Sequence, residues 1–86
     1  MATAKAPKPI GEVTHFYGHL GVAIVKFKQT VPVGAAVRFR GATTDFAEKI
    51  ASIEFDHKPI GEAKKGQEVG IKVSGKVREG DEVFAA

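Results

Sequence analysis

Hydrophobic and polar residues alternate with a period of two along much of the chain. The alternation is clearest at residues 37–40, 50–57 and 69–73. A period of two places alternate side chains on opposite faces of a β-strand, and no segment shows the long 3.6-residue period of an amphipathic helix. The pattern therefore predicts an all-β protein.

Glycine- and proline-containing segments separate the alternating stretches and indicate turns. The predicted strands cover residues 10–17, 22–28, 37–40, 50–57, 69–73 and 82–85. Residues 41–47 are interpreted as a connection, although Asp45 and Glu48 also have the D-x-x-E spacing that caps a short helix. The segment 58–61 is predicted to end the strand before it.

The alternation also predicts which side chains point inward. Phe27, Val37 and Phe39 are expected inside, and along 50–57 the inward set is Ala51, Ile53 and Phe55. Six or seven short strands favour a small antiparallel barrel, and a closed one because closure removes exposed sheet edges.

The domain organisation follows from length and from the first residues. A chain of 86 residues forms one domain. Residues 1–9 alternate Ala, Lys and Pro without an apolar face, so they are predicted to be a disordered tail. Residues 10–86 are assigned to the barrel.

Composition excludes several classes of site. The sequence has no cysteine, which excludes disulfides, thiolate zinc sites and cysteine nucleophiles. The longest clear apolar run, residues 22–25, is far too short to span a membrane. The first residues lack the apolar segment of a secretory signal, so a cytoplasmic location is expected.

Positive charge is concentrated in the first half of the chain. The formal net charge is +3, but residues 1–43 contain six cations and a single acid, Glu12. If the strands on either side of residues 29–36 form a hairpin, then Lys26, Lys28, Arg38 and Arg40 share its outer face. In that arrangement Lys26 would lie near Arg38.

Two interpretations of this basic ribbon remain open. Like charges that face each other across strands are destabilising. In the functional interpretation, the cations contact the phosphates of a nucleic acid. In the plainer one, Glu54 and Asp56 lie on the adjacent strand and neutralise the row, because exposed ion-pair rows are common.

A second group of candidate residues lies beside a glycine turn. Tyr17 and His19 could stack on bases; alternatively, Tyr17 closes the barrel end, and His15 and His19 are solvated. The two histidines are four residues apart, which is a metal-binding spacing only on a helix, so no metal site is predicted.

The sequence offers little for catalysis. Residues 70–77 nearly fit the phosphate-loop pattern G-x-x-x-x-G-K-[ST], but Val77 replaces the hydroxyl residue and no helix follows. There are two serines, and the carboxylates lie on outward faces or turns. We therefore predict no catalytic residue, no cofactor and no nucleotide hydrolysis.

Four stretches of the chain resemble the second domain of translational GTPases, the β-barrel of elongation factor Tu and initiation factor two. These are residues 10–13, 31–41, 60–71 and 77–83, which in that family read G-x-V, V-G-D-x-V-x-x-x-G, A-x-x-G-D-x-V-G-I and R-x-G-D-x-V. Ala35 and Gln67 replace the family's aspartate after the turn glycine, whereas Asp81 keeps it. No GTPase domain precedes the barrel in this sequence, so GTP-driven delivery is not implied.

The resemblance implies a tight turn, with positive φ, at Gly34, Gly66 and Gly80. It also implies a barrel filled by Val33, Val37, Val69, Ile71 and Val83.

Two functional hypotheses follow. The first is a non-catalytic module of translation that contacts tRNA or the ribosome. Its candidate RNA-binding residues, by position, are Tyr17, His19, Lys26, Lys28, Arg38 and Arg40. The second is a protein–protein adaptor that docks on a larger enzyme or translation factor. The oligomeric state remains open, and no membrane association is expected.

Overall fold

The computed structural model describes residues 8–86, and the regular structure in this range consists of β-strands, which confirms the all-β prediction. The predicted tail of residues 1–9 lies outside the described residues except for its last two. The strands are β1 (Gly11–Tyr17), β2 (Val22–Phe27), β3 (Val31–Pro32), β4 (Ala36–Arg40), β5 (Asp45–Lys49), β6 (Ile53–Phe55), β7 (Lys58–Ile60), β8 (Glu62–Ala63), β9 (Glu68–Lys72) and β10 (Glu82–Ala85). Residues 8–86 contain no helix with the length and apolar character needed to cross a membrane.

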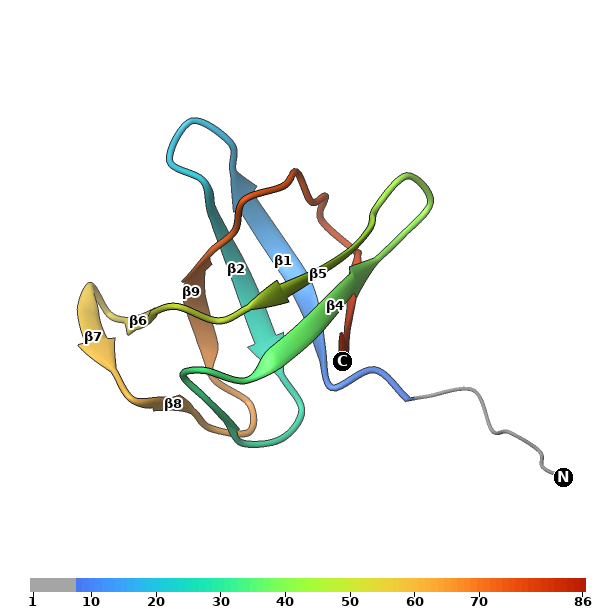
Figure 1. The fold of residues 1–86 in the computed structure, drawn as a ribbon. Coiled ribbons are helices and arrows are strands. Elements are labelled where there is room, and N and C mark those ends of the chain that lie inside the picture. Colours follow the sequence, from blue (N-terminus) through green and yellow to red (C-terminus); the bar gives the residue numbers. More distant parts are fainter. Residues whose placement is uncertain (1–7) are drawn as a thin grey trace, which may run out of the picture.

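Eight of these strands form one antiparallel sheet in the order β5-β4-β10-β1-β2-β9-β6-β7, and β3 pairs separately with β8. The last strand in the sequence, β10, therefore lies in the interior of the sheet, between β4 and β1. The sheet curls around one face, so that β4 and β5 lie in front of β1, β2 and β9 (Figure 1). Among the described residues no backbone pairing joins β5 to β7, so the predicted closed barrel is not confirmed.

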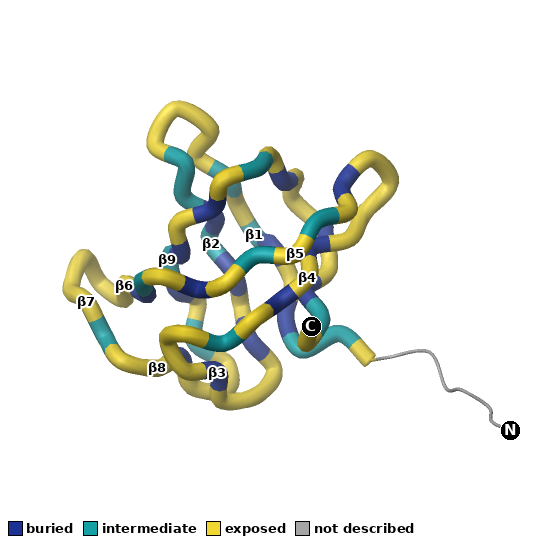
Figure 2. The backbone as a smooth tube through the Cα atoms, viewed as in Figure 1, coloured by how far each residue is buried: buried dark blue, intermediate teal, exposed yellow. Residues whose placement is uncertain are grey.

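The concave face of the curled sheet holds a single hydrophobic core. Phe27, Val37 and Phe39 are fully buried there, as predicted; buried positions are dark blue in Figure 2. Three other predictions were wrong, because Ala51 is exposed and Val33 and Phe55 are each 40% exposed. Ala51 lies in the connection between β5 and β6, before β6 begins. Val33 lies in the turn between β3 and β4, and Phe55 is the last residue of β6, where the strand leaves the core. The core consists of Val13, Ala23, Val25, Phe27, Val31, Val37, Phe39, Ile50, Ile53, Ala63, Val69, Ile71, Val73, Val77 and Val83.

Positive φ angles define the turns. Gly34, Gly66 and Gly80 have φ of 94°, 85° and 93°, which confirms the prediction for these glycines. Asp56 and His57 also have positive φ, 54° and 64°, and form the two-residue turn between β6 and β7. Two successive residues in this region are the signature of a type I′ hairpin turn. The single predicted strand over residues 50–57 was therefore wrong, and β7 was missed.

The segment interpreted as a connection or a short capped helix is a strand. Residues Asp45–Lys49 form β5, which pairs along its whole length with β4. The connection between the two strands is shorter than predicted, and the Gly41 N–H donates across it to the Thr44 carbonyl at 2.8 Å. The alternation in β5 is weak because Phe46 is only half-buried, which is why the period was not recognised.

Side chains hold the β5 edge to the segment that links β9 with β10. The Glu48 Oε1 atom accepts hydrogen bonds from the Ser74 N–H and Oγ–H, at 2.9 and 2.8 Å. Phe46 packs directly over Gly75, where a Cβ atom would lie only 2.9 Å from the ring. This edge is therefore partly covered without backbone pairing.

Candidate functional site

The predicted basic ribbon does not exist as one surface. β2 and β4 do not pair with each other, because β10 and β1 lie between them in the sheet. Lys26 and Arg38 are therefore on strands three places apart, and the hairpin expected around residues 29–36 is wrong. The physical reason is that β2 pairs with β1 across the predicted glycine turn at residues 18–21, and on its other side with β9, which is distant in the sequence.

Outward side chains instead form a row of mixed charge across six strands. The backbone register places Asp45 opposite Arg40, Arg40 opposite Glu82, and Glu82 opposite Glu12. The row continues from Glu12 to Lys26 and from Lys26 to Glu68. Acids thus flank both cations in this row. A surface arranged in this way has no continuous positive stripe for a phosphate backbone.

Arg38 also has an acidic partner. Its Nε–H donates to Asp45 Oδ1 at 2.8 Å, and both side chains are about half exposed. This hydrogen bond, together with the charges of Arg38 and Arg40, holds the pKa of Asp45 below its ordinary value of 3.8. Glu54 and Asp56, which were expected to neutralise the arginines, lie at the other end of the sheet on β6 and its turn.

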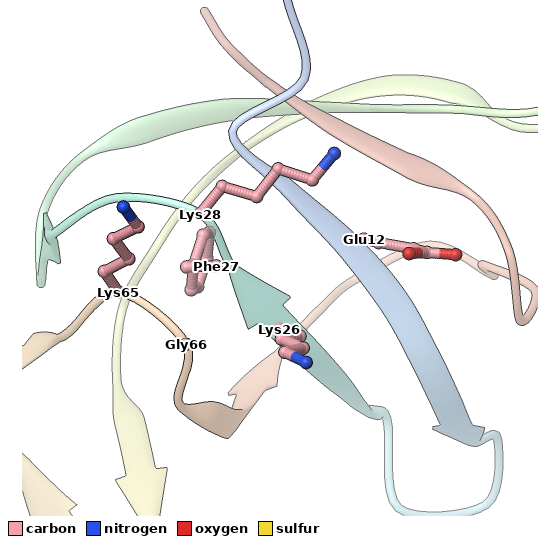
Figure 3. A pocket seen from close by; sticks show the side chains of 6 residues that line it. All are labelled: Glu12, Lys26, Phe27, Lys28, Lys65 and Gly66. Carbon is pink, nitrogen blue, oxygen red and sulfur yellow. The ribbon is translucent and has the colours of Figure 1, made fainter.

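Three lysines surround a shallow cleft near the end of β2. The cleft has a volume of about 300 Å³ and is lined by Glu12, Lys26, Phe27, Lys28, Lys65 and Gly66. The ammonium groups of Lys26, Lys28 and Lys65 point in different directions and do not converge on one point (Figure 3). This arrangement does not cradle a single anion.

Tyr17 and His19 lie at the far end of β1 and in the β1–β2 turn. The His15 ring contacts Tyr17, with ring centroids 4.5 Å apart, and its Nδ1 lies 2.8 Å from Glu79 Oε2. Tyr17 remains 41% exposed and so does not plug the end of the core. Among residues 8–86 no three His, Asp or Glu side chains are grouped as a metal site would need.

The most distinctive surface is a groove on the convex face of β1, β2, β9 and β6, here called the outer groove, with a volume of about 270 Å³. Its apolar lining consists of Tyr17, Leu20, Val22 and Ile24, with Gly70 between Ile24 and Glu54 in the register. Its polar lining consists of Glu54, Asp56, His57 and Glu68.

Among the outer-groove residues, the sequence identified only Tyr17 as a binding candidate and named Glu54 and Asp56 only as charges that could neutralise the arginines. The missed signal was the uninterrupted apolar run of residues 22–25, because an apolar residue at every position gives a strand two apolar faces. A second missed signal was Gly70 within an alternating stretch, since an interior strand glycine marks a place where another group approaches the backbone. Val22 and Ile24 point outward while Ala23 and Val25 are buried.

The fold defined above is that of a small curled antiparallel β domain. Two solved structures share it: those of the C-terminal domain of a U32 peptidase family protein from Geobacillus thermoleovorans and of its selenomethionine variant. The first has a TM-score of 0.85 and 20% identity and covers 98% of this chain and 99% of its own. The variant has a TM-score of 0.84 and 22% identity and covers 90% of this chain and 98% of its own.

A sequence relative points to the same context. A Methanocaldococcus jannaschii protein, described as an uncharacterized protease, is 37% identical over 76 residues, which cover 87% of this chain. The match spans only 19% of that protein's length. No family model matches the chain.

These relatives overturn the assignment to translation. Neither the peptidase domain nor the archaeal protease is an elongation or initiation factor, so the resemblance to their second domain, and with it the expected tRNA or ribosome contact, is wrong. Three of the four matching stretches, residues 31–41, 60–71 and 77–83, contain a turn glycine of positive φ that is followed by a strand with buried valines. Small β domains of different families need the same turn residues, so stretches of this kind are not evidence for one particular family.

Proposed function

We propose that this chain is a non-catalytic docking domain that works in contact with a larger, peptidase-like protein. The observation that carries the proposal is the fold it shares, over 98% of its length, with the C-terminal domain of a U32 peptidase family protein. The match to one fifth of a longer archaeal protease supports the same context. The adaptor hypothesis is therefore preferred to the RNA-binding one.

The distribution of polar groups supports recognition as the role. Within the described part of the chain, the buried polar side chains are Thr44 and Asp81. The Asp81 Oδ2 atom accepts a hydrogen bond from the Arg78 N–H at 2.9 Å, which stabilises the turn before β10. The other carboxylates and the histidines lie on the surface. In this proposal catalysis belongs to the larger protein.

The experiment is capture followed by reconstitution. The tagged chain is incubated with a nuclease-treated extract of its own cells, and bound proteins are identified by mass spectrometry. The captured protein is then purified and mixed with the chain, and light scattering gives the mass of the complex. We expect a defined complex with a peptidase-like protein. Failure to bind any such protein would overturn the proposal, and so would capture that occurs from an untreated extract but not from the nuclease-treated one.

The non-catalytic part has its own test. The purified chain is incubated alone with casein and with fluorogenic peptides, and cleavage is followed by fluorescence and mass spectrometry. We expect no cleavage above a heat-denatured control. Cleavage that co-purifies with the chain would show that the domain is itself a peptidase.

A further inference from the structure

The outer groove owes its shape to a missing side chain. Gly70 lies in the register between Ile24 on β2 and Glu54 on β6. A Cβ atom at Gly70 would lie 3.3 Å from Val22 Cγ1 and 3.5 Å from Ile24 Cδ1. Any other residue would therefore occupy the floor. Glycine weakens a strand interior, so its presence here fits a surface on which another group rests.

The floor of the groove is apolar and its rim is acidic. Val22 and Ile24 form the floor, whereas Glu54, Asp56 and Glu68 supply three carboxylates against one imidazole. Glu54 and Asp56 have no ion pair within the described residues. The negative rim stands out because the whole chain carries a net charge of +3.

Two lysines, Lys26 and Lys72, lie beside this acidic surface but do not line the groove. Lys26 faces Glu68 in the register row on one side, and Lys72 faces Val22 on the other. Glu54 faces Gly70, two residues from Lys72 on the same strand, but among the described residues neither Glu54 nor Asp56 forms an ion pair with a lysine. Their carboxylates are therefore available to an incoming charge.

We propose that the outer groove receives an arginine side chain presented by the larger, peptidase-like protein on which the domain docks. The proposal rests on the proposed function and specifies its chemistry. The arginine methylenes lie on Val22 and Ile24 over Gly70, and the guanidinium reaches Glu54 and Asp56.

The chemistry of the groove favours one long, charged protein side chain. Its volume of about 270 Å³ is at the lower end of typical small-molecule sites, roughly 300–1,000 Å³, so the choice depends on the lining. Arginine combines a long apolar stem with a charged head that pairs with two carboxylate oxygens. That combination matches an apolar floor that ends at an acidic rim.

The first test uses a defined probe. The peptide acetyl-Gly-Leu-Arg-Leu-Gly-amide is titrated into the ¹⁵N-labelled chain, and amide shifts are followed by NMR. We expect saturable chemical-shift changes at Ile24, Glu54 and Gly70, with a dissociation constant of about 1 mM or lower. The citrulline peptide, which is neutral and nearly the same shape, should bind about tenfold more weakly. Equal binding of both peptides, no binding, or shifts elsewhere would overturn the proposal.

Two pairs of variants locate the binding. Gly70→Ala fills the floor, and Gly61→Ala is its control, because nothing lies within 4 Å of a Cβ atom at Gly61. We expect about tenfold weaker binding of the arginine peptide for Gly70→Ala and no change for Gly61→Ala. If Gly70→Ala binds as the wild type does, the groove is not the site.

The second pair removes charge from the rim. The variant Glu54→Gln/Asp56→Asn loses two carboxylates of the groove, and Asn is accepted at the positive φ of residue 56. Glu62→Gln/Glu82→Gln removes the same charge from exposed sites outside the groove. Only the rim variant should lose the preference for arginine over citrulline. A preference retained in the rim variant would refute the acidic contact.

The same variants separate this proposal from the proposed function. If the wild-type chain binds the peptidase-like protein and Gly70→Ala binds it equally well, docking uses another surface and the arginine proposal fails alone. If the wild type binds no such protein, the proposed function fails, and the peptide titration still decides whether the groove accepts arginine. Self-association through this face, seen as concentration-dependent shifts without peptide, would contradict the proposal.

Discussion

Asp81, in the turn before β10, packs its carboxylate against Gly41, in the connection between β4 and β5. Asp81 is 6% exposed, and its Oδ2 atom accepts the Arg78 N–H at 2.9 Å. Its carboxylate lies directly over Gly41, at the start of the β4–β5 connection, where a Cβ atom would collide with Oδ1. The two turns are therefore packed against each other, and only glycine leaves room for the acid.

Gly41→Ala is expected to destabilise the domain by about 2–3 kcal/mol, because the displaced carboxylate loses its hydrogen bond while it remains buried. Urea denaturation followed by circular dichroism measures the change in the free energy of unfolding. Gly61→Ala has open space at its Cβ position and should change it by less than about 0.5 kcal/mol. Equal values for the two variants would show that Asp81 moves aside freely.

The Arg38–Asp45 pair predicts a pH dependence. The native pKa of Asp45 is lowered, chiefly by the hydrogen bond from Arg38. The pair therefore contributes stability above the ordinary pKa of 3.8, and this contribution is lost as the pH falls through the lower native value. Arg38→Gln should raise the pKa of Asp45, measured by ¹³C NMR of its carboxyl carbon. Arg40→Gln is the control, since Arg40 acts on Asp45 only through its charge and should raise that pKa less.

At the scale of the element, the sequence predicts those strands that have one clearly buried face. β4 and β9 were predicted because Val37, Phe39 and Ile71 alternate with exposed residues. β5 was missed because it lies at a sheet edge, with a half-buried face that weakens the period. β7 was missed because Pro59 reads as a breaker, although proline is tolerated in an edge strand.

The candidate site was less predictable than the strands. The six residues predicted to bind RNA do not lie on one strand pair, and acids separate Arg40 from Lys26 in the outer row. The order of strands in the sheet decides which outward residues become neighbours. That order depends on β10, which pairs with β1 and β4 across most of the sequence. Local alternation carries no information about such pairing, so the row of mixed charge could not be foreseen.

The β6–β7 hairpin gives a prediction at this scale. Asp56 and His57 hold the two positive φ angles of its turn, a conformation that costs a non-glycine residue roughly 1–2 kcal/mol. Asp56→Asn/His57→Gly installs the preferred type I′ pair. We expect the free energy of unfolding to rise by about 0.5–1 kcal/mol, less than the relieved strain because glycine loses more entropy on folding. A fall in stability in urea denaturation would indicate a stabilising role for the His57 side chain.

At the scale of the whole molecule, one short strand holds the sheet together. β10 pairs with β1 on one side and with β4 on the other, so it joins β5 and β4 to the other five strands. Val83 brings a fully buried side chain to the core from this strand. The first strand, β1, and the last strand, β10, are thus neighbours in the middle of the sheet. If β10 is removed, the remaining strands lose part of their backbone pairing and part of the hydrophobic core.

Deletion of residues 82–86 is therefore expected to unfold the whole domain and not only its end. Without β10, β1 and β4 each lose a partner, and the backbone groups that paired with it would be left beside an open core, which a domain this small cannot sustain. The ¹H–¹⁵N NMR spectrum should lose its dispersion, and the cooperative thermal transition should disappear. Deletion of Ala86 alone removes a single hydrogen bond, from its N–H to the Ala36 carbonyl at 3.1 Å, and should leave the domain folded. A dispersed spectrum for the longer deletion would mean that β4 and β5 pair elsewhere, and the sheet order described above would then be wrong.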